Sequence, residues 1–139
     1  MKKIMLIDSD VEQLRTLDKG LSNSFQLLNC SRGEKALDLY RIFLPHALVL
    51  DPTTPGLPES GFLRSLRELP GGYRIPVLAL TRIRSTRTLE DIFRWKVDVV
   101  LSKPCAAERA EKKLREMLAH FPSKPAPARP EPEDLLTSI

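Results

Sequence analysis

Four polar residues with complementary chemistry each stand at or just after the end of a short apolar run. They are Asp8 after residues 4–7, Asp51 after residues 46–50, Thr81 after residues 76–80 and Lys103 after residues 97–101. Carboxylates bind hard cations such as Mg²⁺, and a carboxylate can also attack phosphorus to form an aspartyl phosphate. A hydroxyl and an ammonium group can stabilise the transferred oxygens. Brought together, the four residues would make a phosphoryl-acceptor site.

The apolar runs alternate with helical patterns, and a weaker run at residues 25–28 makes five predicted strands in all. The first predicted helix spans residues 10–21 with Asp10 as N-cap, and the second is capped by Ser31 and runs to Phe43. The third spans residues 62–69, after a proline-rich loop. The fourth is capped by Ser85 or Thr86 and carries Leu89, Ile92 and Phe93, and the fifth spans residues 106–120. Short buried strands joined by helices pair in parallel, with helices on both faces. We therefore expect an α/β fold with a doubly wound five-stranded parallel sheet. Ligands bind at the carboxyl ends of such strands, where the four polar residues fall.

The composition predicts a globular domain followed by a proline-rich segment. With 22 Lys and Arg against 18 Asp and Glu, the net charge of the 139 residues is +4, too mild to imply nucleic acid by itself. Five of the 12 prolines lie beyond residue 121. Residues 1–120 are therefore predicted to fold as one domain, and residues 121–139 to form an extended tail or linker.

Several features point to the cytoplasm. No apolar run approaches the roughly 18 residues of a membrane span, so no membrane association is expected. The apolar run at the N-terminus reaches Asp8 too soon for a signal peptide. The two cysteines, Cys30 and Cys105, make neither a disulfide framework nor a metal cluster. A cytoplasmic location is therefore the prediction.

Four motifs carry a resemblance to a known family. They are KIMLIDSD at residues 3–10, LVLD at residues 48–51 followed by Pro55 and Gly56, IPVLALT at residues 75–81, and DVVLSKP at residues 98–104. In order and spacing, over about residues 2–120, the chain resembles the receiver domains of bacterial two-component response regulators. The resemblance implies a flavodoxin-like topology and a role in phosphorelay signal transduction by protein–protein contact.

The resemblance also implies roles for individual residues. Asp51 would accept a phosphoryl group from a histidine of a sensor kinase or phosphotransfer protein, and Thr81 and Lys103 would contact the phosphoryl oxygens. Mg²⁺ would be held by Asp8, Asp51 and the backbone carbonyl of Thr53. Asp10 is a further candidate ligand, although its register favours a helix cap. The bond between Lys103 and Pro104 would be cis.

The chain departs from the family pattern around this site. Ser9 stands where the family has a second acid, so weaker Mg²⁺ binding is expected. Pro52 follows the acceptor and has no N–H to offer. Arg82 replaces a small residue after Thr81, where it could block access or bind an anion through two hydrogen bonds. Val100 aligns with an aromatic residue whose movement couples the site to the output face.

These departures leave two other functions open. The domain could be a pseudo-receiver that docks partners without phosphorylation. It could also be a phosphatase of the haloacid-dehalogenase type, with Asp8 as nucleophile, although the further acidic pair of that family is missing.

The basic residues Arg82, Arg84, Arg87, Arg94 and Lys96 surround the predicted fourth helix. The family uses its fourth helix, fifth strand and fifth helix for output and homodimer contacts, so we expect an output protein to bind there. No direct DNA-binding domain is expected.

Overall fold

The structure, a computed structural model, describes residues 1–82, 90, 92, 94 and 96–120. Five parallel strands form one sheet in the order β2-β1-β3-β4-β5. Their bounds are β1 Lys3–Ile7, β2 Gln26–Cys30, β3 Ala47–Leu50, β4 Val77–Thr81 and β5 Val99–Ser102. This strand order is the flavodoxin-like one. The predicted doubly wound α/β fold is therefore confirmed.

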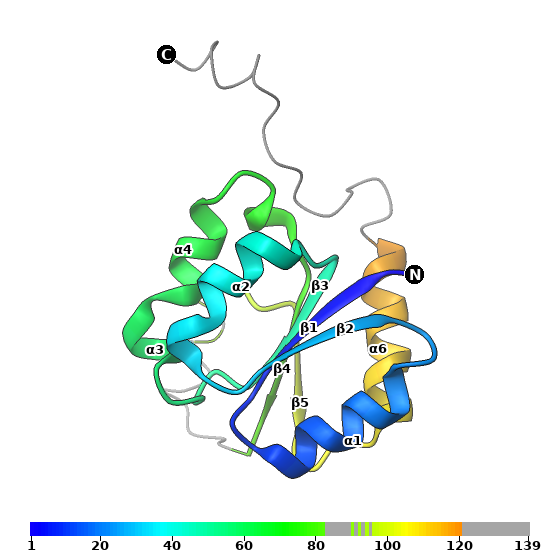
Figure 1. Ribbon diagram of the computed structural model, residues 1–139. Coiled ribbons are helices and arrows are strands. Elements are labelled where there is room, and N and C mark those ends of the chain that lie inside the picture. The colour runs from blue at the N-terminus through cyan, green and yellow to red at the C-terminus, as the bar shows by residue number, and fades with distance from the viewer. Residues whose placement is uncertain (83–89, 91, 93, 95, 121–139) are drawn as a thin grey trace.

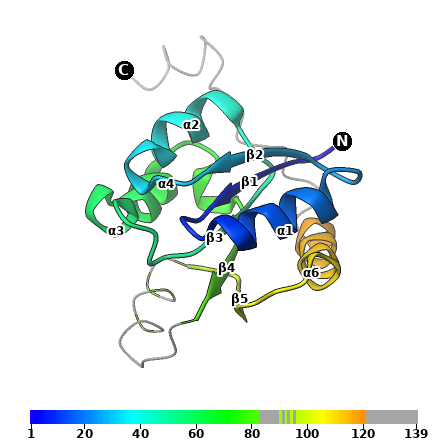
Figure 2. The ribbon, with the colours of Figure 1, turned by 60° about the horizontal axis from the view of Figure 1, so that its bottom comes forward.

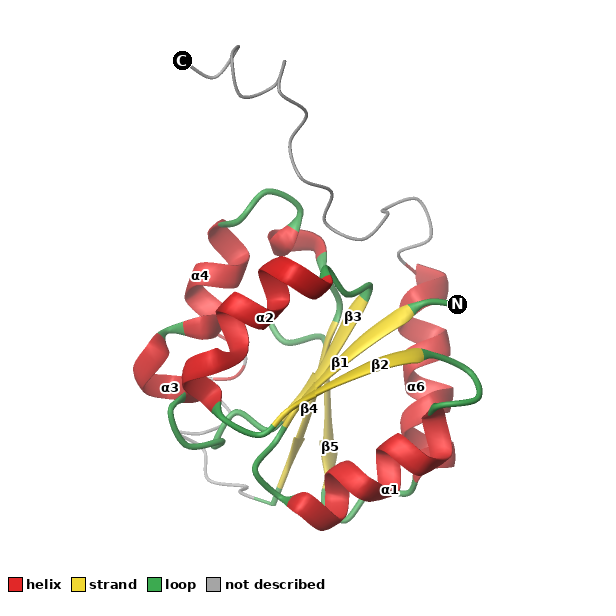
Figure 3. Ribbon diagram, viewed as in Figure 1, coloured by secondary structure: helices red, strands yellow, loops and turns green. Residues whose placement is uncertain are grey.

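Helices cover both faces of the sheet (Figure 1). On one face lie α1 (Val11–Leu21) and α6 (Ala107–His120), and on the other lie α2 (Ala36–Phe43), α3 (Leu57–Ser60) and α4 (Phe62–Glu68). The turned view in Figure 2 separates the two groups, and Figure 3 shows the sheet as the layer between them. Because all five strands are parallel, their carboxyl ends meet at one edge of the sheet.

Each face of the sheet has its own core, because successive side chains of a strand point to opposite faces. In β1, Ile4 and Leu6 pack with residues of α1 and α6, whereas Met5 and Ile7 pack with residues of α2 and α4. The apolar run at residues 4–7 of β1 is therefore explained by burial on both sides.

The start of α1 agrees with the predicted cap. The Asp10 carboxylate accepts a hydrogen bond from the backbone N–H of Gln13 at 3.1 Å. This contact satisfies one of the free donors in the first turn and fixes where the chain leaves β1.

The predicted Ser31 cap is wrong. After β2 the chain first forms a short 3₁₀ helix, η1 (Gly33–Lys35), and α2 starts only at Ala36 without a side-chain cap. The reason is tertiary packing: the Gly33 N–H donates to Pro55 O at 2.9 Å, and a β-carbon on Gly33 would overlap the backbone of Leu57. The chain therefore has to approach the loop after β3 before it can continue as a helix.

The proline-rich loop after β3 contains a short helix that the sequence does not predict. Pro58 lies in the first turn of α3, a position where its missing N–H costs nothing. Gly56 and Gly61 flank α3 with φ values of 85° and 65°, a left-handed conformation that favours glycine. After α4, the short 3₁₀ helix η2 (Gly72–Arg74) leads into β4.

Two predictions fall wholly or mostly outside the described residues. They are the helix after Thr81 that carries Leu89, Ile92 and Phe93, and the tail at residues 121–139. The domain boundary at about residue 120 therefore stays a prediction. Among the helices of the described part, none is both long enough and apolar enough to span a bilayer.

Candidate functional site

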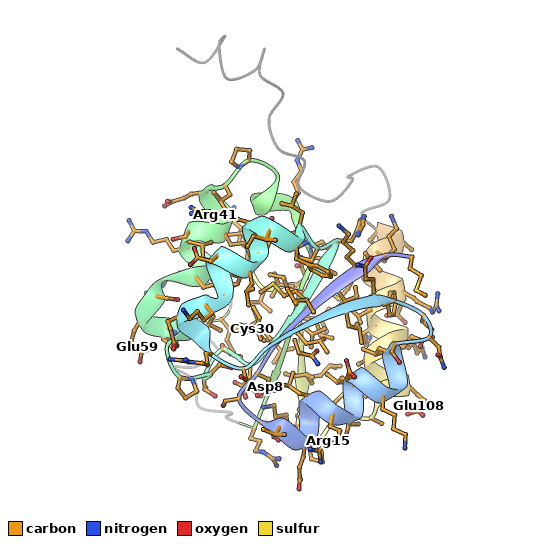
Figure 4. The ribbon with its side chains drawn as sticks, viewed as in Figure 1. Asp8, Arg15, Cys30, Arg41, Glu59 and Glu108 are labelled. Carbon is orange, nitrogen blue, oxygen red and sulfur yellow. The ribbon has the colours of Figure 1, made fainter. Side chains whose placement is uncertain are left out.

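A buried cluster of charged side chains at the carboxyl end of the sheet brings together Asp8, Asp51 and Lys103. The ammonium nitrogen of Lys103 lies 2.6 Å from Asp51 Oδ2 and 2.7 Å from Asp8 Oδ2. Exposed fractions are 3% for the Lys103 side chain, 8% for Asp8 and 9% for Asp51. Figure 4 shows Asp8 at this end of the sheet, beside Cys30 at the end of β2. We call these three residues the acid pocket.

The topology explains why residues far apart in sequence meet here. Asp8 and Asp51 follow β1 and β3, which are neighbours in the sheet, and the Asp51 N–H donates to Ile7 O at 2.9 Å. Lys103 follows β5, and its N–H donates to the Thr81 carbonyl at 3.2 Å. The peptide bond between Lys103 and Pro104 is cis, as the resemblance predicts.

The loop after β3 holds the Asp51 side chain in place. The Thr53 N–H and the Thr53 hydroxyl donate to Asp51 Oδ1 at 2.8 and 2.7 Å. The buried Thr54 hydroxyl donates to the Asp51 carbonyl at 2.8 Å. Asp51 Oδ1 is therefore held by Thr53, and Asp51 Oδ2 by Lys103, so both oxygens are orientated.

The turn after Lys103 is held by Gln13 of α1. The buried Gln13 amide donates to Cys105 O at 2.8 Å and accepts from Cys105 N–H at 3.0 Å. Cys105 itself is buried. Gln13 therefore connects the first helix to the segment that carries the lysine of the acid pocket.

Burial favours the neutral forms of Asp8 and Lys103, whereas the hydrogen bond between them favours their charged forms. Burial raises the pKa of Asp8, although hydrogen bonds from Lys103 and the Asp10 N–H partly oppose this shift. Burial alone would lower the pKa of Lys103, but its hydrogen bonds to Asp51 and Asp8 outweigh burial and raise the pKa. Lys103 is therefore a firmly charged ammonium beside two carboxylates.

Asp10 lies at the border of the acid pocket. Its Oδ2 is 3.8 Å from the Lys103 ammonium and 3.4 Å from a guanidinium nitrogen of Arg82. The hydrogen bond from the Gln13 N–H, with smaller contributions from these cations, lowers the pKa of Asp10. Asp10 thus acts as the predicted helix cap and also adds a third carboxylate near Lys103.

The predicted site residues are gathered to different degrees. Asp8, Asp51 and Lys103 are in direct contact, Asp10 borders them, and Thr81 is buried at the end of β4. Thr53 contacts Asp51 through its N–H and hydroxyl, and the role of its carbonyl stays a prediction.

Sequence reasoning missed Thr54 and Gln13. Thr54 had a signal, because a threonine three residues after Asp51 can bond to the Asp51 carbonyl. Gln13 is a polar residue directly before the buried Leu14 of α1, which is a weaker signal.

The donor set of the acid pocket fits Mg²⁺. This ion binds through one or two carboxylates together with water or phosphate oxygens, which Asp8 and Asp51 can provide. In the described part of the chain, no group of three or more His, Cys, Asp and Glu side chains forms a fuller set of metal ligands. A metal ion bound here would therefore take its remaining ligands from water, from backbone carbonyls or from a phosphoryl group.

Comparison with curated proteins finds sequence similarity over most of the chain, although no protein-family model matches it. The chain is 26% identical over 118 residues to "Probable transcriptional regulator ycf27" of Cyanophora paradoxa, covering 84% of this chain and 48% of that protein. It is 30% identical over 117 residues to Protein RcaC of Microchaete diplosiphon, covering 83% of this chain and 18% of that protein. The chain thus spans about half or less of these relatives.

Solved structures share the fold over nearly their whole length. A response regulator from Desulfuromonas acetoxidans matches with a TM-score of 0.77 and 21% identity, over 87% of this chain and 99% of that one. The receiver domain of sensor histidine kinase PA1611 from Pseudomonas aeruginosa matches with a TM-score of 0.76 and 18% identity, over 85% and 98%. That structure is described with a magnesium ion coordinated in its active-site cleft.

Fold and sequence point to one class of protein. The fold is that of response-regulator receiver domains, and the sequence is similar to that of "Probable transcriptional regulator ycf27". The predicted resemblance is therefore confirmed.

Proposed function

We propose that this domain is a phosphoryl-accepting receiver in a phosphorelay, with Asp51 as the acceptor. The observation that carries the proposal is the contact of Asp51 Oδ2 with the buried Lys103 ammonium at 2.6 Å. A carboxylate at the carboxyl end of a central strand, next to a fixed cation, is placed to react with phosphorus and to have its product stabilised. The donor is a phosphohistidine of a sensor kinase or phosphotransfer protein.

The transfer moves one phosphoryl group between two side chains. A carboxylate oxygen of Asp51 forms the new P–O bond while the P–N bond of phosphohistidine breaks. The leaving imidazole keeps the electron pair of the broken bond and takes a proton from solvent. Hydrolysis later returns the carboxylate and inorganic phosphate.

Asp8, Asp51 and the Thr53 carbonyl are the residues proposed to hold Mg²⁺. When bound, the ion neutralises charge on the phosphoryl oxygens. Lys103 supplies further positive charge to the phosphoryl oxygens, and the Thr81 hydroxyl donates a hydrogen bond to them. Pro52, directly after the acceptor, has no N–H to offer. The Thr53 N–H, one residue further on, already donates to Asp51 Oδ1 and provides a backbone donor there.

Output in this proposal passes through protein–protein contact. The face formed by the predicted helix after Thr81, by β5 and by α6 is proposed to bind an output partner or a second copy of the chain. The protein is proposed to be cytoplasmic. Residues 1–120 are proposed as the signalling domain and residues 121–139 as its tail or linker.

The test is covalent labelling of the full chain. The protein is treated with acetyl phosphate or phosphoramidate and Mg²⁺, and intact mass is measured beside Asp51→Asn. Borohydride reduction converts an aspartyl phosphate to homoserine, and peptide mapping then locates it. We expect one phosphoryl group, on Asp51, absent from Asp51→Asn. A group found on Asp8 would replace the proposal with the phosphatase alternative.

A second candidate function is phosphorylation-independent docking, which two observations favour. Pro52 removes one backbone donor beside the acceptor, and an exposed serine, Ser9, stands in place of an acid. If no adduct forms with either donor, and trifluoroberyllate with Mg²⁺ shifts no amide resonance, docking without phosphorylation becomes the better account.

A further inference from the structure

Arg82 forms an ion pair with Asp10 at the exposed border of the acid pocket. It directly follows β4, its side chain is 64% exposed, and a guanidinium nitrogen lies 3.4 Å from Asp10 Oδ2. Asp10 follows β1, so the contact joins the carboxyl ends of two strands that are not neighbours.

The strand order places this contact over the acceptor. In the sheet, β3 lies between β1 and β4, and Asp51 stands at the end of β3. Strands are about 4.8 Å apart, so β1 and β4 are separated by about 10 Å. A side chain that starts after β4 and reaches a residue after β1 must therefore cross the end of β3. The guanidinium is thus held close to where a group on Asp51 would lie.

The two cations near the acid pocket are held very differently. Lys103 is buried and makes short contacts of 2.6 and 2.7 Å to two carboxylates. Arg82 makes one longer contact at the exposed border. Exposed ion pairs of this kind contribute little to stability. Arg82 can therefore exchange Asp10 for a stronger anion at little cost, whereas Lys103 is held by two short contacts.

We propose that Arg82 is a phosphoryl-binding residue, and that its ion pair with Asp10 is the contact it makes before Asp51 is modified. This inference rests on the proposed function. A phosphoryl group on Asp51 carries more negative charge than the Asp10 carboxylate and offers oxygens that a planar guanidinium binds through two hydrogen bonds. Arg82 thereby adds donors at a site where Pro52 has removed one.

The test measures binding of trifluoroberyllate, a phosphoryl analogue, to the 139-residue chain at saturating Mg²⁺ by ¹⁹F NMR and calorimetry. Arg82→Ala should weaken binding about tenfold, the loss of one charge-assisted contact, and Arg82→Lys should lie between Arg82→Ala and wild type. Arg64→Ala is the matched control, because Arg64 is an exposed arginine on α4 paired with Glu68. It should bind the analogue as wild type does.

A double-mutant cycle separates the exchange of partners from simple charge repulsion. Asp10→Asn keeps a good helix cap but no longer attracts Arg82. It should strengthen binding in the wild-type background, and the gain should shrink when Arg82 is alanine. An equal gain in both backgrounds would show repulsion alone and overturn the inference.

The remaining outcomes keep the two proposals apart. Equal or tighter binding by Arg82→Ala would mean that Arg82 only obstructs the pocket, and the inference would be wrong while the proposed function stands. If wild type binds no analogue and forms no adduct on Asp51, both proposals fail together.

Discussion

The ammonium nitrogen of Lys103 lies 2.6 Å from Asp51 Oδ2, and both side chains are more than nine-tenths buried. Because Asp8 approaches the same nitrogen at 2.7 Å, one lysine is the counter-ion of two buried acids. The same contacts that prepare Asp51 for reaction therefore also decide whether the pocket is stable.

Replacing this lysine should destabilise the fold. Lys103→Met leaves two buried carboxylates without their cation, and we expect the free energy of unfolding to fall by about 3 kcal/mol near neutral pH. Urea denaturation without divalent cations measures the change. Lys112→Met, at an exposed position of α6, is the control and should unfold like wild type. Equal stability of Lys103→Met and wild type would contradict the role of Lys103 as counter-ion.

Restoring the missing acid should strengthen metal binding. Ser9 is exposed and follows Asp8 directly, so Ser9→Asp adds a carboxylate beside the proposed metal ligands. We expect the Mg²⁺ dissociation constant to fall about tenfold, because affinity rises with the charge of the ligand set. Calorimetric titration measures it, with Ser22→Asp at the exposed end of α1 as control. If both variants bind Mg²⁺ equally well, Ser9 is not what limits affinity.

The convergence of Asp8, Asp51 and Lys103 could be predicted from sequence because it follows from topology. Once the strands are parallel, their carboxyl ends share one edge of the sheet, and the residue after each strand must lie there. No side-chain geometry is needed for this conclusion. The same argument placed Thr81 at that edge correctly.

Contacts that depend on tertiary approach could not be predicted. The double hydrogen bond between Gln13 and Cys105 joins residues 92 positions apart, and no local pattern encodes it. The false Ser31 cap has the same origin, because Gly33 must first pack against the backbone of Leu57. Local propensity identifies the elements, while packing between them decides where each one starts.

His46 should make stability depend on pH. The Lys3 N–H donates to His46 Nδ1 at 3.0 Å, and burial, aided by the nearby positive charges of Lys2 and Lys3, lowers the pKa of His46. The unfolded chain therefore binds the proton more readily than the folded one. The contribution of His46 to stability should be complete above the ordinary histidine pKa of about 6.5, and should be lost as pH decreases from that value through the lowered pKa of the folded state.

The measurement is urea denaturation at several pH values for wild type and His46→Gln, whose amide oxygen can still accept the Lys3 hydrogen bond. The loss of stability on acidification should be smaller in the variant, and the difference between the two proteins isolates His46 from the titrating acids. His120→Gln, at an exposed end of α6, should follow wild type. Parallel curves for wild type and His46→Gln would refute the prediction.

Arg67 should be the most important arginine for stability among those of α4. Its guanidinium donates to three backbone carbonyls, those of Gly72 at 2.9 Å, Ile75 at 2.7 Å and Lys96 at 2.6 Å. The side chain of Asp98, 3.9 Å away, supplies a partly buried carboxylate. Arg67 thereby connects α4 to η2 and to the segment before β5. Removing it takes the charged donor away from the carbonyls of Ile75 and Lys96, while Gly72 O still accepts from the Ile75 N–H at 3.3 Å. Hydrogen bonds to charged groups contribute about 1.5–3 kcal/mol each.

We therefore expect Arg67→Ala to lower the free energy of unfolding by about 3 kcal/mol. Arg67→Lys should recover little of this loss, because an ammonium lacks the planar arrangement of donors that reaches carbonyls from separate segments. Arg64→Ala, one turn earlier and exposed, is the matched control and should change stability by less than about 0.5 kcal/mol. Hydrogen exchange at Ile75 and Asp98 locates the effect. Uniform loss of protection across the sheet, without an excess at these two amides, would argue against a local connecting role.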